Sequence, residues 1–174
     1  MQDECHLLWG DTVGYAWGAR GQRLEVPMTN FRERQTYYGA VEMLTGALSV
    51  APFGAGNGDN TVAYLRWLLE KYKKKRLLVL WDGASYHRDE KVQALLHEVN
   101  AGYEPEQWPL TLMTFAPNAP EQNPMEDGWL AGKNHVRRNF TLSKTFAQVK
   151  HAFFSFLQDL QLHSTKFDWY APNS

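Results

Sequence analysis

Residues 76–83 read RLLVLWDG, and this stretch decides how the rest of the chain is interpreted. Apolar residues run without a break from 77 to 81 and end at Asp82 and Gly83, a pattern that predicts a short strand buried on both faces of a sheet. Open α/β sheets bind ligands beyond the carboxyl ends of their strands, so Asp82 is a candidate site residue. An aspartate before a glycine is also typical of a turn, and this alternative stays open.

Helical and strand patterns alternate after and before this strand. Apolar residues recur at helical spacing in residues 62–72, with Asn60 as the expected N-cap, and again in residues 92–99. The run LTLMTFA at residues 110–116 predicts a second buried strand. Two helices are expected to finish the chain, at residues 123–138 and 146–160.

The N-terminal third is rich in strands. Residues 3–9 form a short apolar segment, and residues 36–44 and 47–53 flank a Thr45-Gly46 turn, which predicts an antiparallel hairpin. Residues 14–35, rich in Gly and Arg, are interpreted as an excursion off the sheet. A hairpin followed by helix-separated strands predicts an α/β fold with a mixed five-stranded sheet and helices on its faces. This is the order of a ribonuclease-H-like fold, and residues 1–174, without repeats or a long linker, are expected to form one domain.

Composition predicts a packed intracellular protein. Apolar residues make up 44% of the chain, and no apolar run approaches the roughly 18 residues of a membrane span. The N-terminus is acidic and lacks the basic segment of a secretory signal, while the single cysteine, Cys5, cannot form an internal disulfide. We therefore expect a soluble cytoplasmic protein, associated with the nucleoid if its source is bacterial.

The net charge of −1 conceals two cationic clusters. One lies in residues 71–76, and the other lies in residues 128–158, a stretch without Asp or Glu. Such runs are often only solvated faces, and this alternative stays open. The second cluster adjoins a candidate site, and its members are expected to contact a phosphate backbone. They are Lys133, Arg137, Arg138, Lys144 and Lys150.

Two further acidic positions are candidate partners of Asp82. In the first predicted strand Asp3 and Glu4 face opposite sides, so at most one of them points at a shared site. Glu126 stands in the first turn of a predicted helix, where the helix dipole favours an ionised carboxylate. Residues 123–126, NPME, also have the form of a capping box, so a structural role for Glu126 stays open.

Carboxylates from three separated segments suit a divalent metal centre. Carboxylate oxygens are hard ligands that Mg²⁺ or Mn²⁺ prefers. Two such ions activate an attacking oxygen and stabilise a leaving oxygen during in-line displacement at phosphorus, without a nucleophilic side chain. The residues therefore favour phosphodiester chemistry that uses Mg²⁺ or Mn²⁺, with two ions expected.

Three motifs carry a resemblance to a known family: DE at residues 3–4, WDGASYHR at 81–88 and APNAPEQNPMEDGW at 116–129. In this order they resemble the DDE transposases of the mariner superfamily, especially its bacterial insertion-sequence branch. The third motif is similar to the family segment SP-x-x-NP-x-E. Residues 30–40, NFRERQTYYGA, and 60–72, NTVAYLRWLLEKY, add to a resemblance that spans nearly the whole chain.

The resemblance implies roles for individual residues. Asp3, Asp82 and Glu126 become the catalytic, metal-binding triad, whereas Glu4 and Asp127 become bystanders. The resemblance also implies two residues outside the triad: His87, which positions phosphate or a metal-bound water or else is structural, and Trp129, expected in the core.

The resemblance also implies a function and partners. The expected function is cleavage at transposon DNA ends followed by strand transfer to target DNA; a plain ribonuclease-H-like nuclease and an inactive remnant that only binds DNA or a partner are the alternatives. Family members begin with a helix-turn-helix region that reads the transposon ends, and none precedes Asp3 here. We therefore expect that region on a separate or frameshift-joined subunit, and an active dimer.

Overall fold

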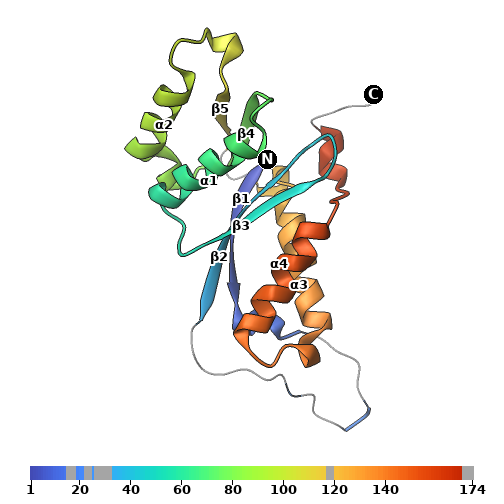
Figure 1. The fold of residues 1–174 in the computed structure, drawn as a ribbon. Coiled ribbons are helices and arrows are strands. Elements are labelled where there is room, and N and C mark those ends of the chain that lie inside the picture. The colour runs from blue at the N-terminus through green and yellow to red at the C-terminus, as the bar shows by residue number, and fades with distance from the viewer. Residues whose placement is uncertain (15–18, 22–24, 26–32, 117–119, 170–174) are drawn as a thin grey trace.

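The computed structural model describes residues 1–14, 19–21, 25, 33–116 and 120–169 (Figure 1). The predicted order of strands and helices is confirmed. The elements are β1 (Gln2–Leu8), β2 (Arg34–Val41), β3 (Leu48–Phe53), α1 (Gly58–Lys71), β4 (Leu77–Trp81), α2 (Glu90–Asn100), β5 (Leu110–Thr114), α3 (Met125–Arg138) and α4 (Phe146–Asp159). Most of the predicted excursion at residues 14–35 lies outside the described residues.

Strands β1, β2 and β3 form an antiparallel sheet in that order. The register places Asp3 opposite Gly39 and Tyr38 opposite Ala51. Gly46 turns the chain between β2 and β3 with φ near +70°, a conformation that favours glycine. The predicted hairpin is therefore confirmed.

Strands β4 and β5 form a separate parallel sheet, in which Val79 lies opposite Leu112. Strand β1 contacts β4, yet in the described part of the chain no ladder of hydrogen bonds joins them. The prediction of one five-stranded sheet is therefore not confirmed, because the structure has a three-stranded and a two-stranded sheet. Apolar patterning identifies a strand without specifying its neighbour, so the sequence alone did not reveal this division.

The expectation that the strand at residues 77–81 is buried on both faces is wrong. Val79 and Trp81 are buried, whereas Leu78, on the opposite face, is 56% exposed. Helices α1 and α2 both contribute to the cluster that covers Val79 and Trp81. On the other face Leu80 packs against the main core, and Leu78 is left exposed. A continuous apolar run indicates a strand suited to burial, but it does not specify how completely the second face is covered.

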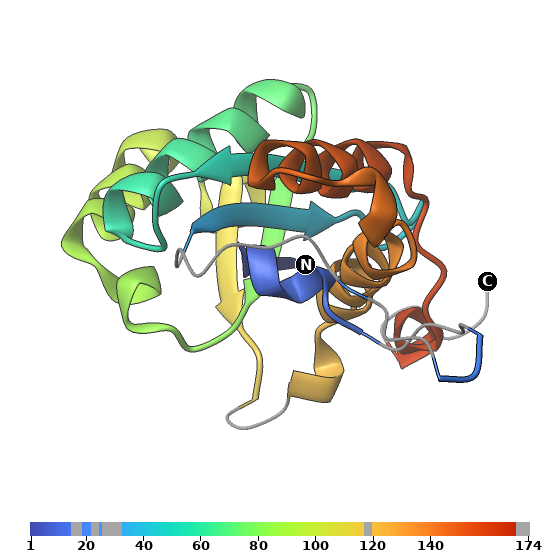
Figure 2. The same cartoon turned by 90° about the horizontal axis from the view of Figure 1, so that it is seen from below.

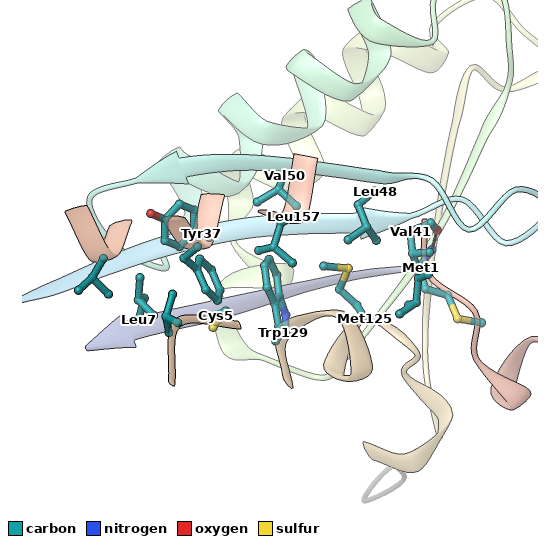
Figure 3. Packing of buried hydrophobic residues seen from close by; sticks show 14 of the residues in the cluster. Met1, Cys5, Leu7, Tyr37, Val41, Leu48, Val50, Met125, Trp129 and Leu157 are labelled. Atoms are coloured by element: carbon teal, nitrogen blue, oxygen red, sulfur yellow. Dashed lines mark hydrogen bonds between the residues drawn. The ribbon is translucent and has the colours of Figure 1, made fainter. Parts of the chain in front are cut away.

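Two helical layers enclose the three-stranded sheet (Figures 1 and 2). Helices α3 and α4 lie together on one face, over the main hydrophobic core, part of which is drawn in Figure 3. Helix α1 covers the opposite face, where Tyr64 and Leu68 pack with Tyr38. Residues of β1 therefore alternate between the α3 side and the α1 side of the sheet.

Local hydrogen bonds define where the helices begin. The N-cap of α1 is Asn57, whose side chain accepts from the backbone N–H of Asn60, so the predicted cap was placed three residues late. Helix α4 begins after Thr145, which forms a reciprocal capping box with Gln148. Among the described residues, none of the helices combines the length and apolar character needed to cross a membrane.

Candidate active site

Asp3 lies on the α3 side of β1. The indole Nε1 of Trp129 donates a hydrogen bond of 3.1 Å to Asp3 Oδ2. Trp129 reaches this position across Gly39, because a Cβ atom there would lie only 2.4 Å from Trp129 Cη2. Trp129 is also buried in the main core, as expected, with its ring among the labelled core residues in Figure 3.

The carboxyl group of Asp3 is held where a negative charge is unfavourable. Burial raises the pKa of Asp3 to about 7, and the negative charges of Glu4 and Asp82 act in the same direction. The backbone N–H of Glu4 and the indole of Trp129 oppose this rise without cancelling it. A nearby cation would favour the ionised form of Asp3, so the environment suits a metal ligand.

Asp82 directly follows β4, at the carboxyl end of the strand. Its side chain is 55% exposed, and its Oδ1 atom accepts from the backbone N–H of Ala84 at 2.9 Å. The turn role that was left open is thus present. It does not exclude ligation, because Oδ2 has no hydrogen-bond donor among the described residues. Asp82 lies close enough to Asp3 for its charge to raise the pKa of Asp3.

Glu4 points to the opposite side of β1, as alternation predicts. Its side chain is only 6% exposed and accepts hydrogen bonds from Gln2, Tyr86 and His87. The expectation that Glu4 is a bystander did not foresee these contacts. The sequence signal available was a second acidic residue beside Asp3 and a Tyr-His pair after Asp82.

His87 and Glu4 form a buried ion pair. Burial would lower the pKa of His87, but the hydrogen bond and charge of Glu4 raise it above its usual value, with Asp82 acting in the same direction. Burial would likewise raise the pKa of Glu4, but hydrogen bonds from His87, Gln2 and Tyr86 hold it below its usual value. Both shifts favour a protonated imidazole that donates through both ring nitrogens.

Glu126 lies in the first turn of α3, and its neighbour Asp127 has a different environment. Glu126 is exposed; its backbone N–H donates to the Asn123 carbonyl, but its side chain makes no hydrogen bond or ion pair with the described residues. Asp127 accepts from Ser164 Oγ at 2.7 Å and from Lys166 Nζ at 3.0 Å. The side chain of Asn123 caps the Met125 N–H, but no capping box through Glu126 forms among the described residues.

The structure brings Asp3 and Asp82 together and leaves Glu126 apart. Among the described residues, no group of three His, Cys, Asp or Glu side chains is close enough to hold a metal ion. Glu126 lies three residues before Trp129, hence on a neighbouring position of the α3 surface, one turn from the residue that contacts Asp3. All three side chains are carboxylates, the hard-oxygen donors that a divalent cation such as Mg²⁺ prefers, so the set fits such an ion by donor type.

The predicted phosphate-contacting cations differ in how free they are. Lys133 Nζ lies 3.3 Å from Asp11 Oδ2, and Arg137 donates to the Asp11 carbonyl, so both are engaged by the chain itself. Lys150 Nζ lies 5.2 Å from the centre of the Phe146 ring. The two exposed members of the set are Arg138 and Lys144.

Similar folds occur in structures of the Mos1 transposase. They include its paired-end complex with the left transposon end (TM-score 0.59, 15% identity, covering 97% of this chain and 49% of that chain). The Mos1 mariner paired-end complex with Mn has a TM-score of 0.56, 16% identity and coverage of 97% and 49%. A pre-cleavage Mos1 transpososome has a TM-score of 0.55, 15% identity and coverage of 97% and 50%. At this identity the likeness concerns the fold, and the chain spans about half the length of these proteins.

Sequence comparison identifies a family. No curated protein matches the chain. The profile of the DDE superfamily endonucleases, in contrast, matches residues 1–150, which include Asp3, Asp82 and Glu126. The match covers most of the 174 residues, and the chain therefore belongs to the DDE superfamily endonucleases.

Proposed function

We propose that residues 1–174 are the single catalytic domain of a DNA transposase from the bacterial insertion-sequence branch of the mariner superfamily. Its reaction is cleavage of phosphodiester bonds at transposon ends, followed by attack of the freed 3′ hydroxyl on a phosphodiester of target DNA. The attack joins the transposon end to the target and releases a 3′ hydroxyl of the cut target strand. The observation that carries this proposal is the contact between β1 and β4, which brings Asp3 within electrostatic range of Asp82, the residue that follows β4. Membership of the DDE superfamily endonucleases and the fold shared with a transposase support it.

In this proposal Asp3, Asp82 and Glu126 hold two Mg²⁺ or Mn²⁺ ions. Bound ions would supply activation of the attacking oxygen and stabilisation of the leaving oxygen. The chain itself holds the Asp3 carboxylate through Trp129 and the Asp82 carboxylate through Ala84. Asp3 is partly shielded from water whereas Asp82 is open, so DNA would approach from the Asp82 side.

DNA is the proposed substrate and partner. The Mos1 neighbours include a complex with a transposon end, which supports this assignment. We propose that the phosphate backbone contacts Lys133, Arg137, Arg138, Lys144 and Lys150, which position a duplex without reading its sequence. A helix-turn-helix region, separate or frameshift-joined, would read the transposon ends, and the active form would be a dimer.

The test is Mg²⁺-dependent nicking of a duplex that carries the element's terminal repeat. Asp82→Asn keeps the shape of the side chain and removes a negative ligand, so nicking should be lost while the melting temperature is retained. Asp59→Asn is the matched control, since Asp59 is 72% exposed and pairs with Lys91 at the surface. Undiminished metal-dependent nicking by Asp82→Asn would refute the proposed site.

Product analysis separates this function from its two rivals. A transposase yields both nicked ends and products in which those ends are joined to target DNA. Hydrolysis without joined products would identify a plain ribonuclease-H-like nuclease. DNA binding without cleavage in Mg²⁺ or Mn²⁺ would identify an inactive remnant.

A further inference from the structure

Glu4 is an unusual residue to bury beside a proposed metal site that already holds two aspartates. A buried carboxylate is unfavourable unless it is paired and hydrogen-bonded. Gln2 Nε2 donates to Glu4 Oε1 at 2.9 Å, Tyr86 OH donates to Oε2 at 2.9 Å, and His87 Nε2 donates to Oε1 at 3.3 Å. Both oxygens are thus occupied, and Glu4 points away from the face that carries Asp3.

His87 continues these contacts to Asp82. Its other ring nitrogen, Nδ1, donates to the backbone carbonyl of Asp82 at 3.0 Å and lies 3.1 Å from Asp82 Oδ1. The ring stacks on Trp81 with the centroids 4.1 Å apart and the planes 1° from parallel. The side chain is 1% exposed, and both nitrogens are engaged. His87 therefore acts most directly on Asp82, and a direct contact with phosphate would need these bonds to break.

We propose that Glu4 is a positioning residue that, through His87, fixes the main chain and carboxylate of Asp82 for metal binding. The inference rests on the proposed function, since it takes Asp82 as a metal ligand. The Glu4–His87 contact fixes the imidazole, and the imidazole with the Ala84 N–H holds Oδ1, which leaves Oδ2 for the ion. Partners that orient a metal ligand typically change metal affinity or activity about 10–100-fold when removed.

The experiment measures Mn²⁺ binding to the protein by electron paramagnetic resonance, without DNA, beside Mg²⁺-dependent nicking. Glu4→Gln keeps the size of the side chain and removes its charge, so Mn²⁺ binding should weaken about tenfold or more. His87→Phe keeps an aromatic ring stacked on Trp81 and removes both hydrogen-bond donors. It should weaken Mn²⁺ binding at least as much as Glu4→Gln does. If Glu4 acts through His87, adding Glu4→Gln to His87→Phe should weaken binding no further.

Matched variants separate positioning from a loss of stability. Ser49 lies in β3, in the same sheet as Glu4, and Ser49→Ala removes its partly buried hydrogen bonds with Tyr72 and Lys71 at the end of α1. This variant should lower the melting temperature without changing Mn²⁺ binding. Tyr86→Phe removes one hydrogen-bond donor to Glu4 and should give a smaller loss of Mn²⁺ affinity than Glu4→Gln. Because this change is mild, it still tests the positioning role if Glu4→Gln fails to fold.

The outcomes distinguish the two proposals. If Asp82→Asn loses Mn²⁺ binding while Glu4→Gln binds like the parent, the positioning role is wrong and the metal site stands. Additive losses in the Glu4→Gln, His87→Phe double variant would also overturn it, since they would mean that Glu4 acts independently of His87. If Asp82→Asn binds Mn²⁺ normally, the proposed metal site fails, and the positioning role fails with it.

Discussion

Gly39 is the position at which a single methyl group most directly tests how Asp3 is held. A Cβ atom there would lie 2.4 Å from Trp129 Cη2, 2.6 Å from Trp129 Cζ2 and 2.8 Å from Met125 Cε. The end of Met125 is flexible and can move. The indole is rigid and fixed by its bond to Asp3, so in Gly39→Ala it must shift away from that carboxylate.

Two opposing effects decide the sign of the change in stability. Gly39 has no positive φ, so alanine fits its backbone, and restricting the unfolded chain would by itself stabilise the protein by about 0.4–1 kcal/mol. Overpacking a well-packed core typically costs about 1–3 kcal/mol. Losing the Trp129 hydrogen bond to Asp3 adds to this cost, roughly 1.5–3 kcal/mol when the acceptor is charged. The costs outweigh the gain, so we expect Gly39→Ala to lower the free energy of unfolding by roughly 1.5–5 kcal/mol.

Urea denaturation of the parent and Gly39→Ala measures this difference. In a chain of this size each kcal/mol lowers the melting temperature by about 2–4 °C. Gly54→Ala is the control, because nothing lies within 4 Å of a Cβ atom there and its φ is not positive. A Gly39→Ala protein as stable as the parent, or more stable, would mean that Trp129 does not hold Asp3 as described.

Three further predictions follow from the site. Without metal, Asp3 has a pKa of about 7 when folded and an ordinary, lower one when unfolded, so between about pH 4 and pH 7 the folded parent keeps a proton that the unfolded chain has released. Its stability relative to Asp3→Asn should therefore fall as pH rises through this window, and urea midpoints that differ by a constant amount would contradict this. Glu126→Gln should abolish Mg²⁺-dependent nicking without loss of stability. Asp127→Asn should nick normally and lose about 0.2–1 kcal/mol of stability, because its ion pair with Lys166 is removed. If Asp127→Asn abolishes nicking and Glu126→Gln does not, the family motif is aligned one residue out. Replacing Arg138 and Lys144 with Ala should flatten the salt dependence of DNA binding by about 0.9 in logarithmic slope per lost phosphate contact, at unchanged sequence preference, and an unaltered slope would remove them from the interface.

Local patterns predicted the order of the elements and that Asp3 and Glu4 lie on opposite sides of β1. Alternation along a strand is a property of the backbone, so it separates Asp3 from Glu4 without knowledge of any neighbour. The hairpin was also predictable from the sequence, because Gly46 marks a turn between two strand-like runs. The cap of α1 was misplaced because Asn57 and Asn60 both suit an N-cap, and only the hydrogen bond distinguishes them.

Contacts between segments distant in the chain could not be predicted from the sequence. The division into two sheets depends on whether β1 and β4 come close enough for a hydrogen-bond ladder, and neither strand's composition specifies that. The partner of His87 lies 83 positions away, and the donor to Asp3 lies 126 positions away. Glu4 was interpreted as a bystander and Trp129 as a core residue, because the contacts of each depend on which side chain faces it in the folded chain.

The three proposed ligands differ in how firmly the protein itself holds them. Asp3 is held by Trp129, and Asp82 by Ala84 and His87, whereas Glu126 has no partner among the described residues. Fixing a free Glu side chain in one conformation costs up to about 1.5–2 kcal/mol of conformational entropy. Metal binding by Glu126 must overcome this cost, whereas the side chains of Asp3 and Asp82 are already held by hydrogen bonds in the folded chain. Anchoring of α3 limits this cost to the side chain, because Lys166 binds the Asn123 carbonyl and fixes the start of the helix. A site arranged in this way would bind a first ion through the two aspartates, and Glu126 would then complete it from a helix that is already in place.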